Sequence, residues 1–102
     1  MDHIDAIIGA HSTINLLPHL VGFLAVAELG SFTAAGRHLG VDKTLLSRRV
    51  KALEDTLETR LLHRTTRQLQ LTDAGRALIE ATREPALTVL SALRSAGADD
   101  VV

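Results

Sequence analysis

The sequence predicts a mainly α-helical domain with a three-helix core, a small β-hairpin and a further helix at the C-terminal end. From residue 16 onward, apolar residues recur at helical spacing, and each expected helix follows a capping residue. Around residues 69–72 the pattern changes to strict alternation, which is typical of a strand. A length of 102 residues suits one domain, and the absence of cysteine excludes disulfides, thiolate nucleophiles and cysteine-based metal sites.

Residues 1–15 are predicted to be an N-terminal extension that is partly ordered. Ile4, Ile7 and Ile8 have helical spacing, but Gly9 and several polar residues follow them. The sequence has no apolar run that could span a bilayer and no basic start that would open a signal peptide. We therefore expect a soluble, cytoplasmic protein that is not exported and does not enter a membrane.

The first two helices are predicted over residues 16–29 and 32–39. Asn15 is the expected N-cap of the first, with Pro18 in its first turn, where the missing N–H does no harm. Ser31 is the expected N-cap of the second, which is rich in small residues. Small side chains allow another helix to come close.

The third helix is predicted over about residues 43–58. Gly40 allows a tight turn before it and Asp42 caps it. An apolar stripe along this helix predicts its buried face: Leu46, Val50, Leu53 and Leu57.

A small hairpin is predicted over about residues 62–71. Leu69 and Leu71 alternate with polar residues in the second strand, and residues 62–64 form its partner, with Thr65 and Thr66 at the turn. The order of helix, short helix, tight turn, helix and hairpin matches a winged helix-turn-helix over residues 16–72.

The last helix is predicted over residues 73–96, with Thr72 as its cap, a kink or break at Pro85, and a frayed tail over 97–102. Its apolar stripe has nothing after it in the sequence to cover it. We therefore expect it to be a linker and dimerisation helix that pairs with a second copy through three residues: Leu87, Leu90 and Leu93.

The net charge of −1 hides a separation of charge along the chain. Residues 37–67 carry +4, whereas residues 1–36 carry −3 and residues 68–102 carry −2. A basic segment alone is usually a solvated helix face. Here it coincides with the third helix and the hairpin, which favours contact with DNA.

The predicted third helix fits the major groove of double-stranded DNA. Side chains in its first turns can donate to base edges: Lys43, Thr44 and Ser47. Arg48 can meet a phosphate, and two arginines of the hairpin can reach the minor groove or the backbone: Arg64 and Arg67.

The stretch 23–75 resembles the N-terminal winged helix-turn-helix domain of LysR-type transcriptional regulators. Three motifs carry the resemblance: AVAELGSFTAAGRHLGV at 25–41, LSRRVKALE at 46–54 and RTTRQLQLTDAG at 64–75. The resemblance implies a homodimer that binds a pseudo-palindromic operator in double-stranded DNA. It implies base contacts from Lys43, Thr44 and Ser47, and backbone or wing contacts from a further set: Thr33, Arg48, Arg49 and Arg67. Lys51 and Arg64 are additional candidates.

The sequence departs from the family pattern at five positions. Lys43 stands where Gln is usual, and Thr44 where Pro or Ser is common, so base preference cannot be carried over. Glu58 replaces the Gly that ends the recognition helix, and Leu62 replaces Phe. Gly36 replaces Ala, which lowers helix propensity by about 1 kcal/mol unless close packing uses the missing methyl.

Other kinds of function find little support. His3, His11 and His19 are spaced eight apart, which does not place them as helical neighbours, so no metal site is expected. No nucleophile elbow, carboxylate pair or phosphate-binding loop occurs, so we expect neither an enzyme nor a cofactor. Phe23 and Phe32 fall at core positions rather than on a stacking platform for single strands.

Two alternatives remain open from the sequence. The winged helix could dock an acidic protein partner through its basic face. The chain could also be a dimerising module that pairs with a full-length regulator and modulates it. Ligand sensing in the LysR family lies in an effector domain, so no small-molecule site is expected within these residues.

Overall fold

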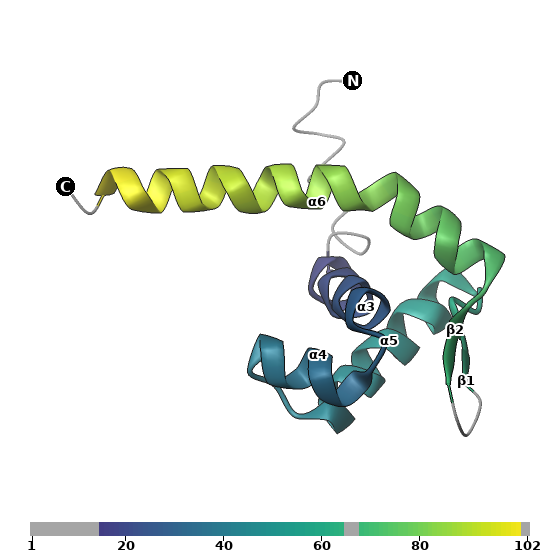
Figure 1. Ribbon diagram of the computed structural model, residues 1–102. Helices are drawn as coiled ribbons and strands as arrows, with labels where there is room; N and C mark the ends of the chain where they lie inside the picture. Colours follow the sequence, from purple (N-terminus) through teal and green to yellow (C-terminus); the bar gives the residue numbers. More distant parts are fainter. Residues whose placement is uncertain (1–14, 65–67, 101–102) are drawn as a thin grey trace.

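The computed structural model describes residues 15–64 and 68–100 and confirms the mainly helical, winged fold (Figure 1). A three-helix core is followed by a two-stranded hairpin and a long helix. The elements are α3 (Leu17–Leu29), α4 (Phe32–Leu39), α5 (Lys43–Leu57), β1 (Leu62–Arg64), β2 (Leu69–Leu71) and α6 (Asp73–Asp100). Figure 1 shows α6 lying across the core, with the hairpin beside α5. The expectations for the N-terminal extension up to residue 14, the hairpin turn at 65–67 and the last two residues lie outside the described residues.

The hydrophobic core forms where α3, α4 and α5 meet. Phe23 of α3 and Leu46 and Val50 of α5 are fully buried, and two leucines that follow α5, Leu61 and Leu62, close the core at the hairpin end. Phe32 is half-buried and packs against the same cluster. Both aromatic rings therefore serve the core, as predicted.

The caps of α4 and α5 are confirmed. The Ser31 hydroxyl accepts a hydrogen bond from the Ala34 amide at 3.1 Å, and the Asp42 carboxylate accepts one from the Thr44 amide at 2.9 Å. Each cap satisfies an N–H that the helix leaves without a partner and contributes about 1 kcal/mol. These two local hydrogen bonds fix the first residues of α4 and α5, the two helices of the helix-turn-helix.

The predicted cap of α3 is wrong. Leu16, not Asn15, occupies the N-cap position, and no side chain caps this helix. Pro18 lies in the first turn, as expected. Leu16 packs against the core, so tertiary packing rather than local capping sets the start of α3.

The end of α5 corrects the predicted buried stripe. Leu57 is 41% exposed, whereas Glu54, one turn earlier, is buried. The core at this level is filled by Leu61 and Leu62, which arrive after the turn. The helix stops at Leu57 because Glu58 takes a left-handed conformation with φ of 52°. The glutamate therefore strains the turn and does not extend the helix.

The hairpin is antiparallel, and its register places Leu62 opposite Leu71 and Arg64 opposite Leu69. Thr72, which follows β2, connects the end of the hairpin opposite its turn to the segment before β1 and to the start of α6. The Thr72 hydroxyl donates to the carbonyl of Arg60 at 2.6 Å and accepts from the Gly75 amide at 2.9 Å, which confirms it as the cap of α6.

Helix α6 runs without interruption through Pro85. Figure 1 shows a bend in its axis between the first turns and the straight second half, so the proline does not break the helix. The helix continues to Asp100, four residues past the predicted end at 96. Within the part of the chain that the structure describes, no helix is long and apolar enough to cross a membrane.

Candidate nucleic-acid interface

The turn between α4 and α5 is held by a close approach at Gly36. Its carbonyl accepts a hydrogen bond from the Val41 amide at 2.9 Å, and a Cβ atom at position 36 would lie 2.7 Å from the Val41 carbonyl oxygen. That distance is shorter than van der Waals contact, so only glycine fits without a backbone shift. The close packing at Gly36 thus requires the absence of a methyl group, which offsets the low helix propensity of glycine.

One exposed face of α5 gathers most of the predicted DNA contacts. Lys43, Ser47 and Lys51 follow one another at a spacing of four, and Thr44 and Arg48 form the adjacent row. Ser47 is half-buried, whereas the others are exposed. The core residues Leu46, Val50 and Leu53 lie on another side of the helix. These five polar residues, hereafter the recognition face, carry three positive charges.

Two other predicted contacts lie apart from the recognition face. Arg49 is half-buried and, at about 100° per residue, lies about 200° around α5 from Ser47. Thr33 is exposed in the first turn of α4, the helix that precedes the turn. If Arg49 or Thr33 contacts the DNA backbone, it does so at a place separate from the one that the recognition face contacts.

Acidic residues of α5 do little to reduce the positive charge of the recognition face. Asp55 pairs with Lys51 at 3.5 Å, but both side chains are about two-thirds exposed, so the pair is weak and easily exchanged for another partner. Glu54 is turned inward, with a side chain that is 7% exposed. The basic character inferred from the sequence is thus present on the surface of the helix.

Glu54 has a structural role beside the recognition face that the sequence did not predict. One carboxylate oxygen, Oε2, accepts hydrogen bonds from the amides of Leu61 at 2.9 Å and Leu62 at 3.2 Å. The other, Oε1, accepts from Arg64 at 3.3 Å. A signal was available in the sequence, because Glu54 continues the row of four-residue steps that begins with Leu46 and Val50.

Arg64 lies at the end of β1, between the helical core and the exposed part of the wing. Its guanidinium pairs with Glu54 and lies over the ring of Phe32, with 5.7 Å from the guanidinium carbon to the ring centroid. About 30% of the side chain remains exposed. Arg67, the other predicted wing arginine, lies outside the described residues.

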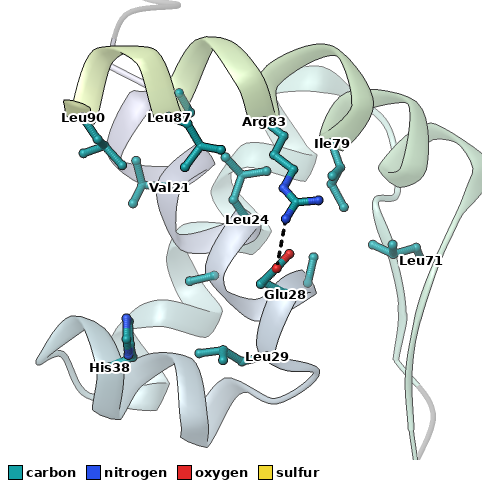
Figure 2. Close-up of a pocket in the computed structure, with 13 residues that line it drawn as sticks. Val21, Leu24, Glu28, Leu29, His38, Leu71, Ile79, Arg83, Leu87 and Leu90 are labelled. Atoms are coloured by element: carbon teal, nitrogen blue, oxygen red, sulfur yellow. Dashed lines mark hydrogen bonds and ion pairs between the residues drawn. The ribbon is translucent and has the colours of Figure 1, made fainter. Parts of the chain in front are cut away.

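The predicted dimerisation residues lie along the second half of α6. Leu87, Leu90 and Leu93 are 51%, 41% and 64% exposed. The first two also line a mostly apolar groove of about 480 Å³ between α6 and α3. Figure 2 shows them pointing towards Val21 and Leu24 of α3, with an ion pair between Arg83 and Glu28 further along.

No cluster of three potential metal ligands occurs among residues 15–64 and 68–100. The lining of the charged cleft beside the end of α5 includes two ion pairs, Glu54 with Arg64 and Lys51 with Asp55. The described part of the chain thus presents a basic helix face and an apolar helix face as its two distinctive surfaces.

A basic helix that follows a tight turn and is flanked by a two-stranded wing defines a winged helix-turn-helix domain. Comparison with known families agrees with this class. Residues 17–76 match the family described as bacterial regulatory helix-turn-helix protein, lysR family. The chain belongs to this family.

Curated relatives are longer proteins. The chain is 37% identical over 89 residues to the probable HTH-type transcriptional regulator LtrA of Klebsiella pneumoniae, covering 87% of this chain and 29% of the relative. It is 53% identical over 62 residues to the HTH-type transcriptional regulator PtxR of Pseudomonas aeruginosa, covering 61% of this chain and 20% of the relative. The chain therefore spans less than a third of either protein.

Two similar solved structures contain DNA. One is the CbnR_DBD–DNA complex, with 40% identity and a TM-score of 0.64, covering 80% of this chain and 95% of that one. The other is the complex of BenM_DBD with catB site 1 DNA, with 31% identity and a TM-score of 0.72, covering 79% and 90%. Both likenesses extend over almost all of the structure compared.

Proposed function

We propose that the domain binds double-stranded DNA in a sequence-specific manner as the DNA-binding part of a transcription regulator. The observation that carries the proposal is the exposed recognition face of α5, which begins at a capped helix N-terminus and presents Lys43, Thr44, Ser47, Arg48 and Lys51 together. An α-helix fits the major groove of B-DNA, and these side chains are donors for base edges and phosphates. The likeness to two DNA complexes supports the same reading.

In the proposed complex, α5 enters the major groove and the wing lies beside it at the minor groove or the backbone. Lys43, Thr44 and Ser47 read bases, and Arg48 binds phosphate. Backbone contacts come from residues at the edges of this surface: Thr33, Arg49, Lys51, Arg64 and Arg67. Phosphate contacts release counterions, so affinity falls steeply with salt concentration.

The domain acts as a homodimer through α6. Three leucines in its second half, Leu87, Leu90 and Leu93, remain 41–64% exposed, a degree of exposure that a second copy would remove. Two recognition helices related by a two-fold axis would then enter successive major grooves of a pseudo-palindromic site. We place this activity in the cytoplasm and assign the domain a binding role rather than a catalytic one.

The proposal is tested by fluorescence anisotropy with a duplex selected in vitro by the full 102-residue chain, and with a random-sequence duplex of equal length. Arg48→Ala is expected to weaken binding to both duplexes by about tenfold, because a charged phosphate contact is lost. Lys43→Ala is expected to change which sequences are selected, because this residue reads bases.

Arg76→Ala is the matched control, since it removes the same charge from an exposed position near the start of α6, more than two turns before the three leucines. It is expected to leave DNA affinity nearly unchanged. Wild-type binding with no preference for the selected duplex would favour docking of an acidic protein instead. Equal affinities for wild type, Arg48→Ala and Lys43→Ala would reject the assignment of α5 as the recognition helix.

A further inference from the structure

Glu54 is the only buried charged side chain among the described residues. It lies in the last turn of α5, the helix that carries the recognition face, and its carboxylate points to the first residues of the wing. A carboxylate loses much of its hydration on burial, so it is retained only where partners replace that water. Its three partners all belong to the segment that leads into the wing or to the wing itself.

The first two partners fix the backbone. The amides of Leu61 and Leu62 both donate to Glu54 Oε2, at 2.9 Å and 3.2 Å, and both residues are buried. A buried amide that loses its acceptor costs about 1–3 kcal/mol, so these bonds hold β1 against the end of α5. The wing is thereby set at a fixed distance from the recognition face.

The third partner is the Arg64 guanidinium, which donates from Nη2 to Glu54 Oε1 at 3.3 Å. Phe32 of α4 supports the other side of the same group, with its ring centroid 5.7 Å from the guanidinium carbon. An arginine has five N–H donors in a rigid plane. A carboxylate at one edge and a ring on one face define that plane while part of the side chain stays exposed to solvent.

We propose that Glu54 is a positioning residue for DNA binding, acting through Arg64. The Glu54 carboxylate and the Phe32 ring hold the Arg64 guanidinium so that its remaining N–H donors meet a phosphate beside the groove that α5 occupies. A preorganised arginine loses less side-chain entropy when it binds, and its planar fork suits a phosphate. The inference rests on the proposed function and assigns a residue that never touches DNA to the interface.

The test compares Glu54→Gln with Asp55→Asn by anisotropy on the selected duplex. The two variants remove the same negative charge from adjacent positions of α5, so charge alone predicts that both bind DNA more tightly. If Glu54 positions Arg64, Glu54→Gln binds about five- to tenfold more weakly. Its single carbonyl oxygen replaces the acceptor of the Leu61 and Leu62 amides, which leaves an NH2 group, a donor, facing the Arg64 guanidinium. Asp55→Asn retains wild-type affinity or gains slightly.

Arg64→Met supplies the second arm and leaves the backbone bonds of Glu54 in place. It is expected to lower affinity by about tenfold and to reduce the slope of log K against log salt by about one, as for one lost phosphate contact. The double variant Glu54→Gln/Arg64→Met should bind no more weakly than Arg64→Met alone, because the glutamate acts through the arginine. Arg64→Lys keeps the charge without the fork and should still lose several-fold.

Circular dichroism separates positioning from folding. A purely structural Glu54 would lower the melting temperature of Glu54→Gln while the folded protein kept its affinity and salt slope, and that result would overturn the proposal. Should Glu54→Gln fail to fold, wild-type affinity of Arg64→Lys and Arg64→Met would overturn it equally. Failure of the proposed function itself is distinct, because wild type would then bind neither duplex or would show no preference for the selected one.

Discussion

The Arg83 guanidinium on α6 lies 3.2 Å from the Glu28 carboxylate on α3, so an ion pair joins two residues that are 55 positions apart (Figure 2). The pair lies in the groove between these helices, whose other lining residues are mostly apolar. Both side chains are well exposed, at 57% and 63%. The arrangement raises the question of whether the pair or the apolar contacts hold α6 on the core.

We expect the ion pair to contribute little. Exposed pairs of this kind contribute less than about 1 kcal/mol and are screened by salt. A double-mutant cycle with Glu28→Gln and Arg83→Met, followed by thermal unfolding, should give a coupling energy of about 0.5 kcal/mol at low salt and none at high salt. A coupling above about 2 kcal/mol would instead make the pair the main tie between the helices.

Dimerisation should depend on the apolar face of α6. Burying a leucine side chain is worth about 1.5–3 kcal/mol, so Leu90→Glu or Leu93→Glu should raise the dimer dissociation constant at least tenfold. Ala92→Glu is the control, because residue 92 is exposed on the opposite side of the helix. Sedimentation velocity measures the effect, and circular dichroism checks that the helix remains.

If Leu90→Glu, Leu93→Glu and Ala92→Glu all raise the dimer dissociation constant equally, then any added charge on α6 is disruptive and the leucine face has no special role. Monomeric wild type at concentrations where DNA is bound would contradict a dimeric complex. In that case protection from chemical cleavage should cover one half-site rather than two.

The fold was largely predictable because its boundaries are set locally. Ser31 and Asp42 cap the helices that follow them, and Gly36 permits the turn. The change from helical period to alternation located the second strand at 69–71, and residues 62–64 are its predicted partner. Each of these signals lies within a few residues of the structure that it specifies.

The missed features depend on contacts between distant residues. Leu57 was predicted to be buried from its spacing, but Leu61 and Leu62 take the core volume after the chain turns back. The sequence led to no prediction for Glu54 beyond its charge, because its partners become neighbours only when β1 lies against α5. Arg64 was for the same reason predicted as a DNA contact alone, although it also has partners inside the domain.

Two glycine substitutions should have opposite effects on stability. Gly36→Ala places a methyl 2.7 Å from the backbone oxygen of Val41, so the turn must shift, at a cost of about 2 kcal/mol. Gly97→Ala meets nothing within 4 Å in the helix α6 and should stabilise by up to about 1 kcal/mol. Urea unfolding measures both, and a neutral Gly36→Ala would mean that the turn can open without loss.

Glu58→Gly should stabilise the domain, because Glu58 caps α5 in the left-handed conformation with φ of 52°. A side chain in this region costs about 1–2 kcal/mol, part of which the greater chain entropy of unfolded glycine offsets, so we expect a gain of about 1 kcal/mol in urea unfolding. Gly40→Ala is the converse control: Gly40 has φ of 70° and open space around its Cβ position, so a loss there reports backbone strain alone. Glu58 follows the last turn of α5, and its side chain takes no part in the hydrogen bonds of Glu54 to the wing. A stabilised Glu58→Gly variant should therefore keep wild-type DNA affinity. A loss of affinity would mean that the strained turn itself sets the position of the wing.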